Sequence, residues 1–192
     1  MTTAIAPQTT GHGFQIHNAE TADPQTISNI QSHYGMVPNL LGGLAEAPAA
    51  AEGYMALSTL MGQTSFTPTE RHVLWFTINA FHECHYCMAA HTFMANKEGV
   101  DEAVIQTARE VGSYSDPKLE ALRVFALAMT EKRGWVEASD IDAFLEAGFT
   151  RQQIFEVVLA ISHKVLSNYT NHLLETPVDP PFAAFTWQSP NA

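Results

Sequence analysis

The sequence predicts an all-α protein, and three observations carry this prediction. Apolar residues recur at helical spacing along most of the chain, as at Ile27, Ile30 and Tyr34. Helix-start signals such as Asp23 followed by Pro24 precede these stretches, and glycines follow several of them. No segment alternates apolar and polar residues with an excess of β-branched side chains, so a thioredoxin-like βαβ framework is not expected.

The length and composition indicate a single domain. A chain of 192 residues with 46% hydrophobic content is long enough to bury one substantial core. Residues 1–22 show no periodicity, so we expect a flexible N-terminal arm followed by one all-α domain over residues 23–187. The proline-rich run 176–181 is expected to be non-helical and to pack across the surface of the domain or of a neighbouring subunit.

The helix boundaries follow from local signals. The clearest is a capping box, with Thr67 at the N-cap, Pro68 at the first helical position and Glu70 three residues after the cap. Other helices begin at Asp-Pro pairs or at Thr150, and glycines end them. The buried side of the helix after the capping box is expected to comprise Val73, Phe76, Thr77 and Ala80. The expected helices cover residues 24–34, 38–41, 47–63, 68–81, 85–97, 101–111, 117–132, 139–147 and 150–174.

The charge distribution excludes several partners. The net charge is −11 and no Lys or Arg precedes Arg71, so the chain lacks a basic surface for nucleic acid or for anionic lipid. The N-terminus has no signal-peptide pattern and no run approaches twenty apolar residues, so a cytoplasmic protein is expected. Nothing resembles a glycine-rich phosphate loop, so we expect no nucleotide and no other cofactor.

The most informative motif is the octet from Cys84 to His91. It contains both cysteines of the chain, spaced C-x-x-C, and a histidine four residues after the second one. On a helix these positions share one face, which brings the two sulfurs and the imidazole within reach of one another. In a reducing compartment such a pair is catalytic or metal-binding more often than it is a structural disulfide.

The octet suits thiol redox chemistry. We expect Cys87 to be the nucleophile, because His91 one turn onward can accept its proton. Attack on a peroxide would give a sulfenic acid at Cys87, and Cys84 is placed to condense with it as the resolving thiol. Two plainer alternatives stay open. The cysteines are simply small core residues, or they bind zinc with His91 and a distant His72 or His172.

The residues around this octet resemble a known family. The run 67–71, an apolar helix and the run 83–91 are similar to the alkylhydroperoxidase D-like and carboxymuconolactone decarboxylase superfamily. The likeness is close over residues 38–111, and the runs 168–172 and 176–177 resemble its peroxidase-related branch. The resemblance implies an AhpD-like helical bundle that assembles into a symmetric homo-oligomer, such as a dimer, trimer or hexamer.

The resemblance also implies roles for individual residues. By motif, Cys87 corresponds to the peroxidatic cysteine, Cys84 to its disulfide partner and His91 to part of a proton relay. The relay glutamate of alkylhydroperoxidase D lies twelve positions before the first cysteine, where this chain has His72. His72 is therefore one candidate for the relay, and Glu70 and Glu83 are two others.

Three further residues are candidates for lining the pocket. His85 and Tyr86 lie between the cysteines, and His172 lies on the last helix four residues after Asn168. Each also has a structural interpretation, as a solvent-facing or core-packing side chain. The same holds for Trp75, Phe76, Phe125 and Met129, which we expect to lie in the core or at an interface.

The leading functional prediction is a thiol-dependent peroxidase, or peroxiredoxin-type antioxidant enzyme. It would reduce small alkyl hydroperoxides through a C-x-x-C disulfide cycle and be restored by an external thiol or disulfide reductant. Three alternatives remain: disulfide exchange without preference for peroxide, a carboxymuconolactone decarboxylase-type lyase, and a non-catalytic helical oligomer stabilised by metal.

Overall fold

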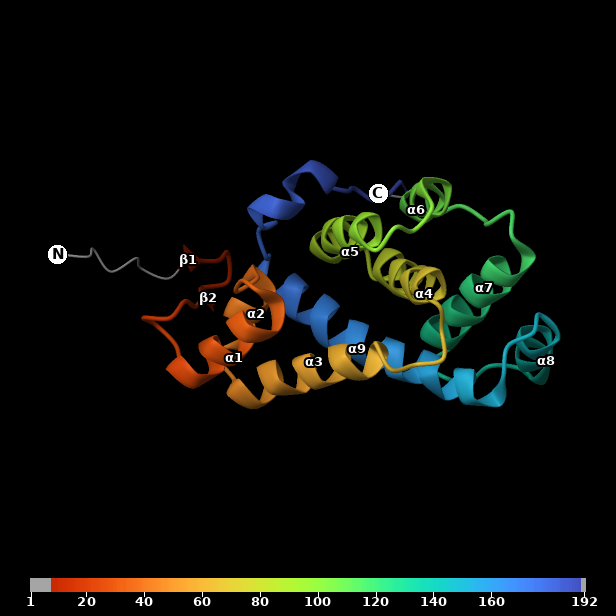
Figure 1. Ribbon diagram of the computed structural model, residues 1–192, viewed down its shortest axis with the longest axis horizontal. Coiled ribbons are helices and arrows are strands. Elements are labelled where there is room, and N and C mark those ends of the chain that lie inside the picture. The colour runs from red at the N-terminus through yellow and green to blue at the C-terminus, as the bar shows by residue number, and fades with distance from the viewer. Residues whose placement is uncertain (1–7, 191–192) are drawn as a thin grey trace.

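A computed structural model describes residues 8–190, and it confirms the all-α fold class (Figure 1). Its only sheet, within these residues, is a two-stranded antiparallel hairpin near the N-terminus. The elements in chain order are β1 (Gln8–Thr9), β2 (Gln15–Ile16), α1 (Pro24–Tyr34), α2 (Asn39–Leu44), α3 (Pro48–Met61), α4 (Pro68–Phe81), α5 (His85–Lys97), α6 (Glu102–Arg109), α7 (Pro117–Glu131), α8 (Ala138–Glu146), α9 (Arg151–Leu174) and the 3-10 helix η1 (Pro180–Phe185).

The predicted helix caps form as expected. The Asp23 carboxylate accepts the backbone N–H of Thr26 at 2.8 Å, and α1 ends at Gly35, whose φ of 75° favours glycine. The capping box of α4 is complete, because Thr67 Oγ1 accepts the Glu70 N–H and the Glu70 carboxylate accepts the Thr67 N–H. Local signals therefore fix where these helices begin and end.

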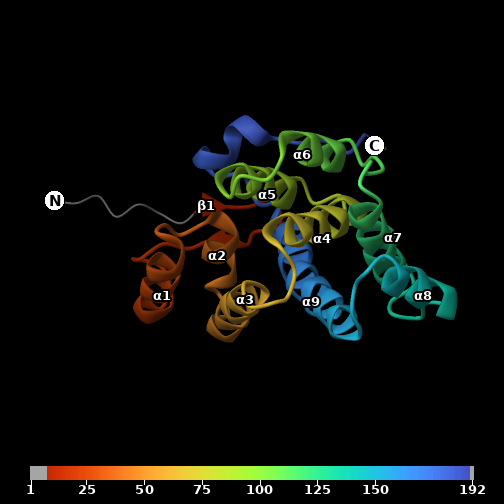
Figure 2. The ribbon, with the colours of Figure 1, turned by 45° about the vertical axis from the view of Figure 1, so that its right-hand side comes forward.

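Helix α4 lies at the centre of the fold. It packs against α5, α6, α7 and α9, while α1, α2 and α3 lie on one side of the long α9 and α8 lies near its other end (Figures 1 and 2). The prediction of one buried side for α4 holds for Val73 and Phe76, but Thr77 and Ala80 are only partly buried. The prediction was also too narrow, because α4 buries His72, Leu74, Trp75, Ile78 and Asn79. A helix with neighbours on all sides buries side chains around its whole circumference.

The apolar side chains form two clusters, and α5 contributes to both. The first cluster joins α4, α7, α8 and the first half of α9, and at its centre Phe144 stacks on Phe125 at 4.3 Å and on Phe149 at 4.4 Å between ring centroids. The second cluster joins α1, α2, α3, the start of α5 and η1, and it contains both cysteines. The thiols therefore lie inside the protein.

The N-terminal residues show more structure than an arm without contacts. Residues 1–7 of the expected arm lie outside the described residues, but β1 pairs with β2 and Ile16 is buried against α2. The His17 N–H donates to Gly42 O at 3.0 Å, and a Cβ added to Gly42 would meet His17 O at 2.8 Å. Glycine at position 42 thus permits the close approach of this segment to α2.

The proline-rich C-terminal run corrects one prediction. We expected residues 176–181 to be non-helical, but Pro180 and Pro181 open the 3-10 helix η1, which packs on α5. Proline is tolerated in a first helical turn, where its missing N–H would have no partner. Just before η1, the Asp179 carboxylate accepts the N–H of Asn39 at 3.1 Å and the hydroxyl of Tyr86 at 2.5 Å.

None of the helices in residues 8–190 combines the length and the apolar composition that crossing a membrane requires.

Candidate functional site

The backbone between α4 and α5 turns sharply and places the thiols at a helix start. Glu83 has a φ of 52°, a left-handed conformation that is uncommon outside glycine, and the Cys84 N–H then donates to Asn79 O at 2.9 Å. Cys84 is the N-cap of α5, and Cys87 lies in its first turn. Both sulfurs therefore lie where the helix dipole favours negative charge.

Cys87 is surrounded by hydrogen-bonding side chains from α9. Its sulfur lies 3.2 Å from Asn171 Nδ2 and 3.8 Å from Ser167 Oγ. Both cysteines are free thiols, and the residue surfaces are only 2% exposed for Cys87 and 1% for Cys84. Among described residues, no hydrogen bond joins Cys87 to His91. The Asn171 amide N–H can donate to a Cys87 thiolate that is shielded from water.

The two thiols have opposite acidities. Burial opposes the ionisation of Cys87, but a hydrogen bond from Cys84, the charge of Lys164 and hydrogen bonds from Ser167 and Asn168 outweigh it and lower the pKa of Cys87 to about 5. The hydrogen bond to Cys87 and burial raise the pKa of Cys84 above its ordinary value. Near neutral pH the pair is thus one thiolate and one thiol.

His91 contacts a buried lysine. Lys164 on α9 is 1% exposed, and its Nζ lies 2.8 Å from His91 Nε2. Burial, together with the charge of Lys164, holds the pKa of His91 well below its usual range. His91 Nδ1 is buried without a partner, and its ring packs against Trp75 at 4.8 Å between centroids. His91 is therefore a neutral imidazole in a largely apolar setting.

The three relay candidates occupy different surroundings. His72 is fully buried with its Nε2 3.4 Å from Glu98 Oε2, and its ring centroid lies 6.1 Å from that of His91. Burial lowers the pKa of His72, although Glu98 opposes this. Glu70 completes the α4 capping box and pairs with Lys118 Nζ at 2.8 Å. Among these candidates, His72 lies beside the His91 ring, and Glu70 has structural partners away from the thiols.

Glu83 and the three pocket candidates border a cavity of about 560 Å³ that reaches Cys84. His85 and His172 are exposed at this cavity, whereas Tyr86 is buried and its hydroxyl donates to Asp179. Its remaining walls come from His82, Asn171, Glu175 and Thr176. Asn171 lines the cavity and also contacts Cys87, so the cavity ends one side chain short of the Cys87 sulfur.

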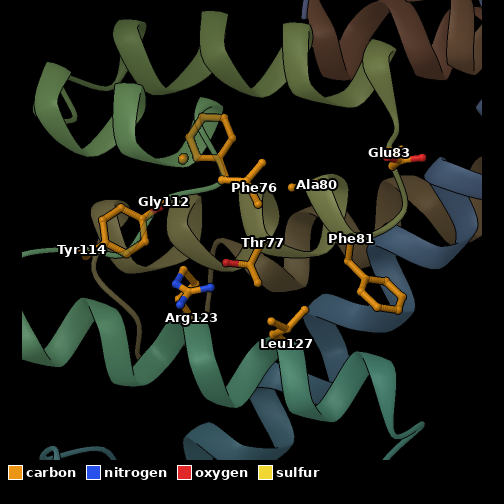
Figure 3. A pocket seen from close by; sticks show the side chains of 11 residues that line it. Phe76, Thr77, Ala80, Phe81, Glu83, Gly112, Tyr114, Arg123 and Leu127 are labelled. Carbon is orange, nitrogen blue, oxygen red and sulfur yellow. The ribbon is translucent and has the colours of Figure 1, made fainter. Parts of the chain in front are cut away.

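A second cavity, of about 310 Å³, lies between α4 and α7 and contains neither cysteine (Figure 3). Phe76, Ala80 and Leu127 contribute to its walls, and Arg123 points into it. The Arg123 guanidinium forms two hydrogen bonds with the Glu120 carboxylate, so its charge is already compensated. The cavity is lined by both apolar and polar side chains, and Glu83 borders both this cavity and the one beside Cys84.

Sequence reasoning missed the contribution of the second half of α9. Lys164, Ser167, Asn168 and Asn171 are all buried and face the thiols and α4. Asn168 had been noted only for its spacing to His172, and its Nδ2 donates to Asn79 Oδ1 at 2.9 Å. The available signal was the polar spacing i, i+3, i+4 and i+7 in a helix whose other half is apolar.

The zinc alternative receives no support from the geometry. Within residues 8–190, no group of three or more His, Cys, Asp or Glu side chains is arranged to hold a metal ion. His172 is exposed at the cavity rim, and His91 contacts Lys164.

Comparisons with known proteins place this fold. The model of the carboxymuconolactone decarboxylase family matches residues 48–128, and no curated protein matches the chain. An uncharacterized peroxidase-related protein with an alkylhydroperoxidase AhpD core from Ralstonia eutropha JMP134 is 22% identical, with a TM-score of 0.75, over 87% of this chain and 92% of that one.

Two further structures share the fold. An uncharacterized peroxidase-related protein from Silicibacter sp. TM1040 is 18% identical, with a TM-score of 0.74, over 95% of this chain and 97% of that one. A variant of the debrominase Bmp8, in complex with 2,3,4-tribromopyrrole, is 15% identical, with a TM-score of 0.71, over 96% of both chains. The chain thus matches the carboxymuconolactone decarboxylase family model over residues 48–128 and shares the AhpD-like fold over most of its length.

Proposed function

We propose that this protein is a thiol peroxidase that reduces small alkyl hydroperoxides, with Cys87 as the peroxidatic and Cys84 as the resolving cysteine. The family and the similar folds support an enzyme of the peroxidase-related or decarboxylase-like kind. The observation that carries the finer assignment is geometric, because both thiols are buried at the start of α5 and Asn171 Nδ2 lies 3.2 Å from the Cys87 sulfur. The hydrogen bond from Cys84 and the charge of Lys164 lower the pKa of Cys87 despite its burial, while the hydrogen bond with Cys87 and burial raise the pKa of Cys84. Such a pair holds one nucleophile and one proton at neutral pH.

The proposed cycle begins with attack of the Cys87 thiolate on the distal peroxide oxygen. The O–O bond breaks, Cys87 becomes a sulfenic acid, and the alkoxide takes up a proton and leaves as an alcohol. Cys84 then loses its proton and attacks the Cys87 sulfur, so that the S–S bond forms and water leaves. The sum is one hydroperoxide and two thiols converted to one alcohol, one water and one disulfide.

The cavity beside Cys84 supports a route for both substrates. It provides about 560 Å³ in front of Cys84 and Asn171, enough for a small hydroperoxide or the end of a thiol reductant. A reductant thiolate entering here would meet the Cys84 sulfur and release Cys87 as a thiolate, which is a good leaving group because of its low pKa. A second reductant thiol would then free Cys84.

The proposal is tested by intact mass spectrometry of the reduced protein before and after one equivalent of an alkyl hydroperoxide. The wild type should lose two hydrogens, as an intramolecular disulfide forms, and one equivalent of peroxide should disappear. The Cys84→Ser variant should instead retain one oxygen as the Cys87 sulfenic acid. Unchanged mass and unchanged peroxide in the wild type would refute the assignment.

One observation favours a second candidate, disulfide exchange without preference for peroxide. The cavity meets Cys84 directly, while Cys87 lies behind Asn171. That arrangement places the resolving sulfur, and not the nucleophile, in the wall of the cavity, where an external disulfide would enter. Comparing the rates of oxidation by a hydroperoxide and by a small aromatic disulfide separates the two candidates.

The lyase alternative makes a different demand on the site. A carboxymuconolactone decarboxylase-type reaction would need acid and base groups and no thiol, so Cys87→Ser would keep activity on such a lactone while His91→Ala would lose it. Loss of activity in both variants would remove this alternative.

We also propose a homo-oligomer, on the basis of apolar side chains left at the surface. Trp135 is 86% exposed, Phe155 75% and Leu173 58%. Symmetric association would cover such side chains. Light scattering should give a multiple of the 21.1 kDa chain mass, and a monomer would refute this proposal.

A further inference from the structure

The cation that balances a Cys87 thiolate can be found by excluding the other charged groups near it. Lys164 is a buried lysine, and among residues 8–190 no carboxylate lies within ion-pair distance of it. A buried ammonium without an anion is costly, so an anion is expected nearby. The thiols are the acidic groups on α5 whose acidity responds to the charge of Lys164.

The histidines around Lys164 are poorly suited to carry the positive charge that balances the Cys87 thiolate, as their contacts show. His91 on α5 accepts the hydrogen bond of the ammonium at Nε2, and a protonated ring could not accept it. His163, on α9 itself, is buried with both ring nitrogens unpartnered, and burial holds its pKa well below the usual range. His72 on α4 approaches Glu98 at 3.4 Å. Of the other cations on these helices, Lys97 and Arg151 are exposed and Arg71 lies 3.9 Å from the Glu98 carboxylate, which leaves Lys164 as the buried cation.

We propose that the Lys164 ammonium, held in place by His91, and not a protonated His91, is the cation that balances the Cys87 thiolate. Lys164 and Ser167 are one helical turn apart on α9, and Ser167 lies 3.8 Å from the Cys87 sulfur, which places the lysine stem beside the thiol. His91 is then a positioning residue that orients Lys164. This inference rests on the proposed role of Cys87 as a reactive thiolate.

The arrangement gives Lys164 a second task in the proposed cycle. The alkoxide that leaves when the O–O bond breaks needs a proton, and the Lys164 ammonium carries one at the site. Lys164 would then take the proton of Cys84 as that thiol attacks the sulfenic acid, and pass it to the departing hydroxide to form water. Reduction of the disulfide by an incoming thiol returns a proton to Lys164 and a thiolate to Cys87, so the charges balance.

The test measures thiolate absorbance in the ultraviolet at pH 6, with no peroxide present. The Lys164→Met variant keeps the length of the buried stem without its charge, and it should lose the Cys87 thiolate signal by about tenfold or more. The His91→Gln variant keeps an acceptor for Lys164 but can carry no positive charge, and its signal should fall by less than about twofold. A large loss in His91→Gln with a retained signal in Lys164→Met would overturn the proposal.

A second measurement guards against a variant that fails to fold. Nitrogen chemical shifts of His91 in the reduced wild type should show a neutral ring from pH 6 to 8, whereas an imidazolium would overturn the proposal. Both measurements are independent of peroxide turnover. If peroxide is not consumed while the lysine dependence holds, the peroxidase assignment fails and the ion pair stands.

Discussion

The two halves of α9 bury different kinds of side chain. In the first half Val157 and Ala160 are fully buried in the apolar cluster of α4, α7 and α8. In the second half Lys164, Ser167 and Asn171 are buried beside the thiols. Burying polar groups stabilises a fold only when they are fully paired.

The second half of α9, which we call the polar half, does not pair all of its buried polar atoms. Both ring nitrogens of His163 and the side-chain oxygens of Asn168 and Asn171 lack partners within the described protein. The first half is thus built for stability, whereas the second half holds polar groups that stabilise charge on Cys87. Substitutions in the two halves should therefore separate effects on stability from effects on thiol reactivity.

The largest effect is expected from Cys87→Ser. Removing the nucleophile should reduce the rate of peroxide consumption by roughly 10⁴-fold or more. A coupled assay of hydroperoxide loss measures this. Cys84→Ser should still consume the first equivalent of peroxide, and activity in Cys87→Ser close to the wild type would contradict the assignment.

Phe144→Ala should act on the apolar cluster instead. Phe144 is 1% exposed and stacks on two other phenylalanines, so truncation should lower the free energy of unfolding by about 3–5 kcal/mol. The pKa of Cys87 should stay unchanged in the protein that remains folded. Phe155→Ala, on an exposed side chain, is the control and should change stability by less than about 0.5 kcal/mol. A shifted thiol pKa in Phe144→Ala would show that the two halves are coupled.

Asn171→Leu should have the reverse effect. It removes the N–H that lies 3.2 Å from the Cys87 sulfur but keeps the side-chain volume. A hydrogen bond to a charged group contributes about 1.5–3 kcal/mol, so the pKa of Cys87 should rise by about one to two units. Thiolate absorbance against pH measures the shift, and Asn96→Leu, exposed on α5, is the matched control. An unshifted titration in Asn171→Leu would remove this residue from the site.

Acid should lower the free energy of unfolding, because several buried histidines near the thiols resist protonation. Burial holds the pKa of His91 and His163 well below the ordinary value of 6.5, and it also lowers that of His72. Below pH 6.5 the unfolded chain binds protons that the folded chain cannot bind, so stability must fall as the pH falls. The unfolded Cys87 thiol is protonated as well, which adds in the same direction.

The slope should approach about 1.4 kcal/mol per pH unit for each of His91 and His163 once the pH falls below 6.5. Urea unfolding between pH 7 and pH 5 measures it. His33→Ala, at an exposed position, should leave the slope unchanged, while His163→Phe should reduce it. Stability that is flat over this range would contradict the burial of neutral imidazoles.

Much of the fold could be predicted because its signals are local. The capping box of Thr67 and Glu70 forms as expected. Glu70 was also a relay candidate, but its carboxylate is bound by the capping box and by Lys118. The hairpin near Ile16 and the 3-10 turn at Pro180 were missed, because tertiary packing on α2 and α5 forms them. Propensity alone does not report such contacts.

The two sulfur atoms of the candidate site could be predicted from the sequence, but the side chains that surround them could not. The spacing of Cys84, Cys87 and His91 is visible in the sequence, whereas a lysine in a helix is normally assigned to the solvent face. Only the path of α9 through the protein shows that Lys164 is buried and hydrogen-bonded to His91. Long-range packing therefore decides the polar half of α9.

The most direct test of the central claim is a pH titration of thiolate absorbance in the reduced wild-type protein. The account predicts that one thiolate per chain appears with a midpoint near pH 5, from Cys87, and that Cys84 ionises only above its ordinary range. Two thiols that ionise together near the ordinary cysteine pKa of about 8.5 would contradict it.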